Sequence, residues 1–82
     1  MNQIQIETNE NFVQFVNNLK KQSKQQWDQF VADFLFKYGV NIRAYNILAI
    51  VVTKDAVYIY PYYYNITIEL KPGKNGNIVI IL

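Results

Sequence analysis

The acidic side chains are the first candidates for chemistry, because the chain contains neither histidine nor cysteine. Those two residue types supply the commonest general base and the commonest zinc, iron and copper ligands. The six carboxylates are spread along the chain, and no pair has the spacing of an acid–base couple or a metal site. We therefore expect no catalytic residue, no metal ligand and no cofactor, and we predict that the protein is not an enzyme. The carboxylates are those of Glu7, Glu10, Asp28, Asp33, Asp55 and Glu69.

Two short motifs match known sites, and both have simpler explanations. Residues 73–76 (GKNG) contain part of a phosphate-binding loop, but the full motif has further spacing requirements and joins a strand to a helix. Here the motif lies between two β-prone runs, which favours a hairpin tip. Residues 65–67 (NIT) match the glycosylation sequon, yet about one such match is expected by chance in a chain so rich in asparagine.

Lysines form one local cluster of positive charge. Lys20, Lys21 and Lys24 lie close together, and Lys71 and Lys74 lie at the predicted hairpin tip. Lysines beside aromatic rings are typical of surfaces that bind single-stranded nucleic acid, where bases stack on rings and ammonium groups meet phosphates. The net charge of +2 is too slight to indicate nucleic acid by itself, and the single arginine argues against base-specific recognition. Nucleic-acid binding through these lysines is therefore the alternative function.

Tyrosines crowd the middle of the chain, at Tyr58, Tyr60 and 62–64. Tyrosine favours strands and is enriched at protein interfaces, because its ring is apolar while its hydroxyl stays hydrated. The simpler interpretation is an outer sheet face whose rings cover their neighbours. We take Tyr58, Tyr60 and Tyr63 as candidate interface residues.

The stretch 45–70 predicts most of a β-sheet. Ile47–Val52 (ILAIVV) is a short apolar run rich in β-branched residues, which is typical of a strand covered on both faces. A short polar break then predicts a hairpin to Val57–Tyr60, where residues alternate between the two faces. Clean alternation over 64–70 predicts a third strand, with one apolar face formed by Tyr64, Ile66, Ile68 and Leu70.

The stretch 71–76 (KPGKNG) is the strongest turn signal in the chain. Pro-Gly suits a type II turn and Asn-Gly a type I′ turn, so we predict a hairpin. It leads to Asn77–Leu82 (NIVIIL), an uncharged strand that is apolar on both faces. We expect this last strand to form an open edge of the sheet, and the link 40–46 is a candidate for a further short edge strand.

Two amphipathic helices are expected before the sheet. In the first, Phe12, Phe15, Val16 and Leu19 share one helical face, and Thr8 or Asn9 is the expected N-cap. Ahead of it, alternation over Gln3–Glu7 predicts either a first strand or a frayed arm.

Ser23 with Gln26 matches a capping box, which predicts that a second helix starts there. Gly39 is well placed as its left-handed stop, and its apolar face comprises Trp27, Phe30, Val31, Phe34 and Tyr38. No glycine or proline separates the two segments, so one continuous helix over 9–38 is the alternative to a helical hairpin or a kink. We favour the hairpin or kink, because one helix of that length is long for so small a domain.

These elements predict a small α+β domain, with two N-terminal helices (a helical hairpin or one kinked helix) packed on one face of a four- or five-stranded antiparallel β-meander. Two helices cover a sheet of that width on one face only. The second, apolar face and the bare last strand then require a partner. We expect a homodimer or a subunit of a complex, with an interface that includes Ile78, Val79, Ile80 and Ile81 besides the tyrosines.

Length and composition support a single domain over residues 1–82. No secretory signal and no apolar run long enough to span a membrane is visible, so we expect a cytoplasmic protein that does not contact membranes. Residues with AT-rich codons dominate, as in many viral and plasmid proteins of low-GC hosts. The predicted function is a non-enzymatic protein-interaction domain, and a virus- or plasmid-encoded inhibitor of a host enzyme, acting in the host-cell cytoplasm, belongs to this class.

Overall fold

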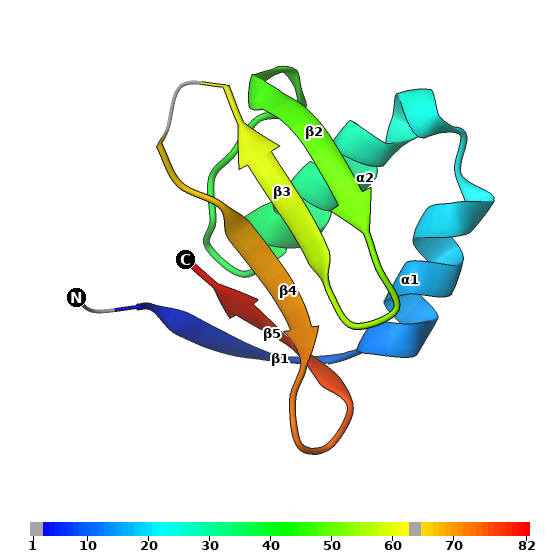
Figure 1. The fold of residues 1–82 in the computed structure, drawn as a ribbon, viewed down its shortest axis with the longest axis vertical. Helices are drawn as coiled ribbons and strands as arrows, with labels where there is room; N and C mark the ends of the chain where they lie inside the picture. The colour runs from blue at the N-terminus through cyan, green and yellow to red at the C-terminus, as the bar shows by residue number, and fades with distance from the viewer. Residues whose placement is uncertain (1–2, 63–64) are drawn as a thin grey trace.

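The protein is an α+β domain with two helices and one five-stranded antiparallel sheet, as seen in a computed structural model that describes residues 3–62 and 65–82. Figure 1 shows the sheet in front, with α2 passing behind β2 and β3. The elements in chain order are β1 (Gln5–Asn11), α1 (Phe12–Lys21), α2 (Lys24–Lys37), the 3₁₀ turn η1 (Ala44–Asn46), β2 (Ile47–Val52), β3 (Val57–Pro61), β4 (Ile68–Pro72) and β5 (Asn77–Ile81).

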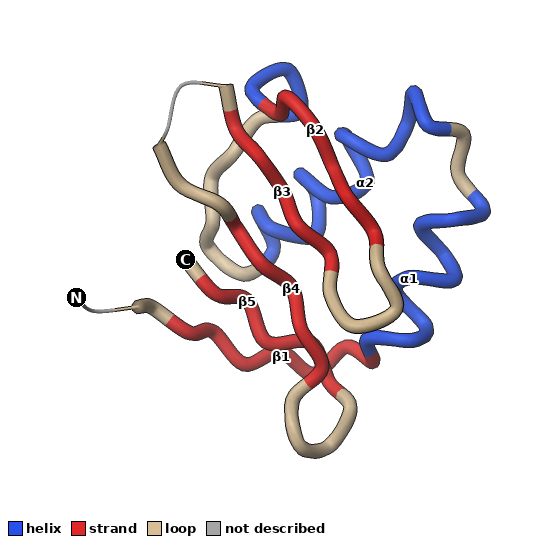
Figure 2. Tube along the Cα trace, in the orientation of Figure 1, coloured by secondary structure: helices blue, strands red, loops and turns tan. Residues whose placement is uncertain are grey.

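The strand order is β1-β5-β4-β3-β2, so the sheet is not a simple meander. Strands β2 to β5 follow one another, but β1 comes from the other end of the chain and pairs with β5 (Figure 2). Ile6 lies opposite Ile80, and Ile4 exchanges backbone hydrogen bonds with Leu82. The expectation that the last strand forms an open edge is therefore wrong: β5 has a neighbour on each side, and the edges are β1 and β2.

The β2–β3 hairpin is confirmed, but β2 is not covered on both faces. Thr53 closes the turn, because its Oγ1 accepts hydrogen bonds from the Asp55 and Ala56 amides at 3.2 and 3.0 Å. Of the six residues of β2 only Ile47 is buried, since the strand lies at the edge of the sheet. The link before it forms the 3₁₀ turn η1 instead of a further strand.

The β4–β5 hairpin is also confirmed, with a different turn from those predicted. Gly76 donates to the Gly73 carbonyl at 3.0 Å and has a left-handed φ of +83°. Gly73 and Asn75 lack positive φ, so neither the type II nor the type I′ turn forms. Strand β4 begins only at Ile68, which leaves Ile66 exposed, and Tyr64 lies outside the described residues.

Two separate helices form, as favoured, with a break at Gln22 and Ser23. Asn11, not Thr8 or Asn9, caps α1: its Oδ1 accepts from the Gln14 amide at 3.0 Å. Thr8 and Asn9 instead belong to β1, which runs directly into the helix. Ser23 is the N-cap residue of α2, but its side chain makes no capping hydrogen bond.

Gly39 ends α2 as predicted, with φ +87°. The Gly39 amide donates to the Phe36 carbonyl and the Val40 amide to the Leu35 carbonyl, at 3.1 and 2.9 Å. This is the Schellman arrangement, in which a left-handed residue satisfies the last carbonyls of the helix. Leu35 and Val40 are both buried, so the cap also joins the helix end to the core.

Helical and strand side chains share one apolar core. Alternate residues of the strands are buried in it, for example Val57 and Ile59 in β3 and Ile78 and Ile80 in β5. The intervening residues of β3 and β5 are only half-buried. The helices contribute Phe12, Phe15, Val16, Leu19, Val31, Ala32, Phe34 and Leu35.

Candidate interaction surface

The outer face of the sheet, meaning the face whose side chains point away from the core, is the first candidate for a binding surface. One row of side chains crosses all five strands on this face. Cross-strand pairing places Tyr58 between Val51 and Glu69, and Ile81 between Glu69 and Gln5. Adjacent side chains in such a row lie about 5 Å apart and form a continuous surface.

Two further rows, one on each side of the first, add one apolar position each to β3 and β5 on the outer face. Tyr60 lies opposite Ala49, and Val79 lies between Lys71 and Glu7. The Lys71 Nζ lies 3.6 Å from the Glu69 Oε2, and both side chains are partly exposed. Such a surface ion pair contributes little to stability, about 0–1 kcal/mol, so it can be rearranged by a docking partner. The outer face thus has apolar side chains on β3 and β5, on either side of the Glu69–Lys71 pair on the central strand β4, and Glu7 lies on the edge strand β1.

The structure divides the predicted interface residues into two groups. Tyr58, Tyr60, Val79 and Ile81 lie on the outer face and are half-buried. Ile78 and Ile80 are 0% exposed in the core, so they are unable to contact a partner. Their predicted role is wrong, because β5 alternates between core and outer face. Tyr63 lies outside the described residues.

The predicted lysines do not form one surface. Lys20 and Lys21 end α1, and Lys24 begins α2. Lys71 and Lys74 lie at the β4–β5 hairpin, and Figure 1 places this hairpin and the junction of the helices at different sides of the molecule. A single nucleic-acid strand would therefore have to cross the molecule to meet all five.

The exposed edge of β2 was missed by the sequence-based interpretation. Leu48 and Val51 are 58% and 44% exposed, and no residue of Ile47–Val52 is charged. Tyr45, just before the strand, is the most exposed of the large apolar side chains in the described residues. No local pattern could have revealed this edge, because an apolar run has the same sequence at an edge as in the centre of a sheet.

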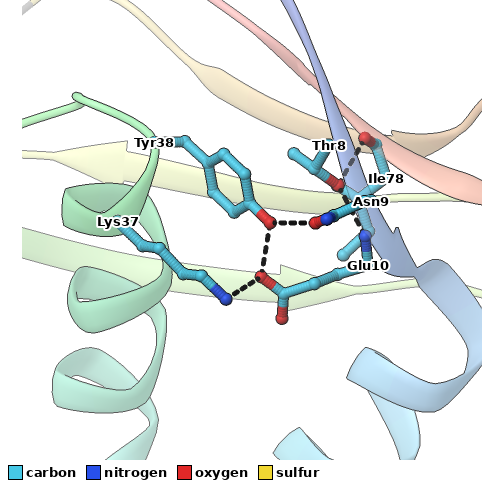
Figure 3. A network of polar contacts seen from close by, with 6 residues as sticks. All are labelled: Thr8, Asn9, Glu10, Lys37, Tyr38 and Ile78. Atoms are coloured by element: carbon cyan, nitrogen blue, oxygen red, sulfur yellow. Dashed lines mark hydrogen bonds and ion pairs between the residues drawn. The ribbon is translucent and has the colours of Figure 1, made fainter.

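A polar cluster joins β1 to the end of α2 (Figure 3). The Tyr38 hydroxyl lies 2.7 Å from the Glu10 Oε2 and 3.0 Å from the Asn9 Oδ1. It has one proton for these two acceptors, so it donates to one at a time. Lys37 Nζ also lies 3.2 Å from the Glu10 Oε2. Nearby, the Thr8 Oγ1 donates to the Ile78 carbonyl at 2.9 Å, which ties β1 to β5.

The same cluster perturbs the ionisation of Tyr38. Burial, and next its hydrogen bond to Glu10, raise the pKa of Tyr38 above its usual value. The hydroxyl therefore stays protonated and acts as a donor that positions β1. Glu10 lies near the end of β1, and its carboxylate accepts hydrogen bonds from Tyr38 and Lys37 at the end of α2.

A shallow groove of about 350 Å³ lies between the helices. Phe15 and Phe34 form its base but are almost wholly buried, and Asp33 on its rim accepts a hydrogen bond from Gln29 at 2.7 Å. Across residues 3–62 and 65–82, no three side chains of the metal-binding types gather into a possible ion site. Within the same residues, neither helix combines the length and apolarity that a membrane span needs.

Comparison of the chain with protein-family models, with curated proteins and with solved structures finds no significant match.

Proposed function

We propose that this protein is a non-enzymatic interaction domain whose protein partner docks on the outer face of the sheet. The observation that carries the proposal is the separation of the outer face from the core. Tyr58, Tyr60, Val79 and Ile81 belong neither to the core nor to the partly buried residues packed against it. Part of each side chain is thus left in water, although all four are largely apolar.

Placement of both helices against the inner face is part of this proposal. The large helical side chains, such as Phe15, Phe34 and Leu35, share the core with Ile59 and Ile68 of the inner face. The helices then shelter that side alone, and the outer side is free for another molecule. Apolar side chains that stay partly exposed on one face are typical of a protein-binding site.

The chemistry of the outer face suits a protein partner better than a nucleic acid. Tyrosine rings with hydrated hydroxyls are enriched at protein interfaces. The charged groups on this face include Glu7 and Glu69 as well as Lys71, and Glu69 already pairs with Lys71. A phosphate backbone would meet these carboxylates as well as the lysine, which opposes binding. A homodimer, a complex subunit and an inhibitor of a host enzyme all remain members of the proposed class.

The test is affinity capture from cells of the native host with two sets of variants. We expect Tyr58→Ser with Tyr60→Ser to lose the proteins that the unchanged chain retains, because the rings are removed from the outer face. The control replaces Lys20, Lys21 and Lys24 by Gln and should retain those proteins.

The reverse result would refute the proposal. If the lysine variant alone loses its target, and that target is removed by nuclease or by about 0.5 M salt, the protein binds nucleic acid, since phosphate contacts are strongly salt-dependent.

A further inference from the structure

The two edges of the sheet differ sharply in chemistry. The β1 edge includes the carboxylates of Glu7 and Glu10 and is otherwise mostly polar. The β2 edge, Ile47–Val52, has no charged or polar side chain. Monomeric proteins usually protect an edge strand with charges, prolines or a covering segment, because its unpaired backbone groups accept another strand. Only β1 has such protection by charge.

The hairpin geometry shows which backbone groups of β2 are open. The Thr53 amide donates to the Ala56 carbonyl, so Thr53 faces β3. In an antiparallel pair the backbone N–H and C=O groups of successive residues point alternately toward the partner strand and away from it. Those of Val51, opposite Tyr58, therefore also point toward β3. The amides and carbonyls of Ile50 and Val52 therefore point away from the sheet. In the described part of the chain, no strand lies beyond them.

We propose that β2 pairs with β2 of a second copy of this chain, in antiparallel orientation, about a two-fold axis at Val51. This register places Ile50 of each copy opposite Val52 of the other. Each of these two pairs exchanges two backbone hydrogen bonds, so the amides of Ile50 and Val52 in both copies, four in all, find acceptors. The two Val51 side chains meet on the outer face. The result is a continuous sheet of ten strands.

The second copy suits this edge better than an unrelated chain for three reasons. The pairing is self-complementary, as a two-fold interface requires, and places no like charges opposite each other within the strand. The net charge of +2 gives only weak repulsion between copies. The third reason is the area of the outer face.

One outer face is small for a stable protein interface. Five strands at about 4.8 Å spacing and about 17 Å length give a plan area of about 400 Å². A standard interface covers about 800 Å² of each partner. Two copies joined through β2 present a continuous face of about that size. The inference thus deepens the proposed function, on which it rests: the dimer supplies the surface on which a further partner docks.

Cysteine cross-linking tests the register directly, because the chain has no cysteine of its own. The proposed axis makes Val51 and Val51 of the second copy a non-hydrogen-bonded pair, with Cα atoms about 4.5 Å apart, which a disulfide can span. We expect Val51→Cys to form a disulfide-linked dimer almost completely under mild oxidation at micromolar concentration. Val13→Cys, at a more exposed apolar position on α1, is the control and should stay largely unlinked.

Sedimentation of unlinked protein provides the second test. The unchanged chain should sediment as a dimer at micromolar concentration. Val51→Lys removes the apolar contact between the two Val51 side chains and places two ammonium groups opposite each other. Together these changes should weaken the dimer about 100-fold, without changing the circular dichroism spectrum. Ile4→Lys, beside the opposite edge and 60% exposed, should leave the dimer intact.

The outcomes separate the two proposals. A monomeric unchanged chain, or a dimer in which Val51→Cys links no faster than Val13→Cys, overturns the β2 pairing. If such a chain still captures a partner through Tyr58 and Tyr60, the proposed function stands alone. If Val51→Cys links as expected but the tyrosine variant retains every captured protein, the pairing stands and the docking face is wrong.

Discussion

The hydroxyl of Tyr38 offers the most direct test of how β1 is held against α2. Removing it by Tyr38→Phe deletes one oxygen and keeps the ring, whose centroid lies 5.2 Å from that of Phe34. The deletion removes the single proton that the hydroxyl donates either to the Glu10 Oε2, at 2.7 Å, or to the Asn9 Oδ1, at 3.0 Å. The Lys37 contact to Glu10 remains. The variant therefore isolates the hydrogen bonds of one hydroxyl.

The expected loss of unfolding free energy is about 1 kcal/mol. A hydrogen bond to a charged group contributes about 1.5–3 kcal/mol when sheltered from water. The Glu10 side chain is 35% exposed, so water replaces part of the lost interaction and the expected loss falls below that range. In a domain of this size, a loss of about 1 kcal/mol lowers the melting temperature by about 4–8 °C.

Thermal and urea unfolding followed by circular dichroism measures this loss. The matched control is Tyr45→Phe, which deletes the same atom from a side chain that is 78% exposed and should leave the melting temperature unchanged. A double-mutant cycle with Glu10→Gln assigns the loss to the Tyr38–Glu10 pair. If Tyr38→Phe melts within about 1 °C of the unchanged protein, the cluster does not hold β1 in place, and our account of it is wrong.

Three further measurements follow from the fold. Because the pKa of Tyr38 is raised in the folded state, its contribution to stability should be present below its unfolded pKa of about 10 and be lost as pH rises through the folded value. Urea unfolding measured at a series of alkaline pH values should show this loss for the unchanged chain, and Tyr38→Phe should lack it. Gly39→Ala should cost about 1 kcal/mol of unfolding free energy, measured by urea unfolding, because φ is +87° and the added Cβ meets no atom within 4 Å, which leaves backbone strain as the only cost. Gly39→Asn should cost less, and a smaller loss for Ala than for Asn would contradict this reasoning. In hydrogen exchange on the monomeric Val51→Lys variant, amides of β5 should exchange far more slowly than those of Ile50 and Val52, and equal rates would disprove the strand order.

The helices show how much local sequence can predict. The 3.6-residue spacing of Phe12, Phe15, Val16 and Leu19 indicated the buried face of α1, and all four are buried. Gly39 marked the end of α2, because a left-handed residue is needed wherever that helix stops. The N-cap of α1 was misplaced, because β1 extends to Asn11 through pairing with β5. That pairing joins opposite ends of the chain and has no local signal.

For the strands, the sequence predicted which residues face the core better than it predicted where each strand begins. Alternation correctly separated Ile59 in the core from Tyr58 and Tyr60 outside it. It failed at Ile66, which follows the pattern of the third strand but precedes β4 and is exposed. Alternation shows only that every second residue has similar polarity. Loop residues next to a strand can continue this pattern by chance, as Ile66 does.

The candidate interface was half predictable for the same reason. The sequence indicated that β5 is apolar on both faces, and the structure confirms that Val79 and Ile81 face away from the core. The sequence did not show that Ile78 and Ile80 face inward. In an uncharged apolar strand either set of alternate residues could face the core, so the set that does depends on the register with β1 and β4.

By itself, the sequence determined the α+β class, the two amphipathic helical segments, the positions of the β2–β3 and β4–β5 hairpins, and the absence of histidine and cysteine. Only the tertiary structure decided that β5 lies inside the sheet and that β2 is left at an edge. The physical reason is that side chains record burial, whereas strands are joined by backbone amides and carbonyls that are alike at every residue except proline. Which backbone edge stays open is settled only when the whole chain has folded.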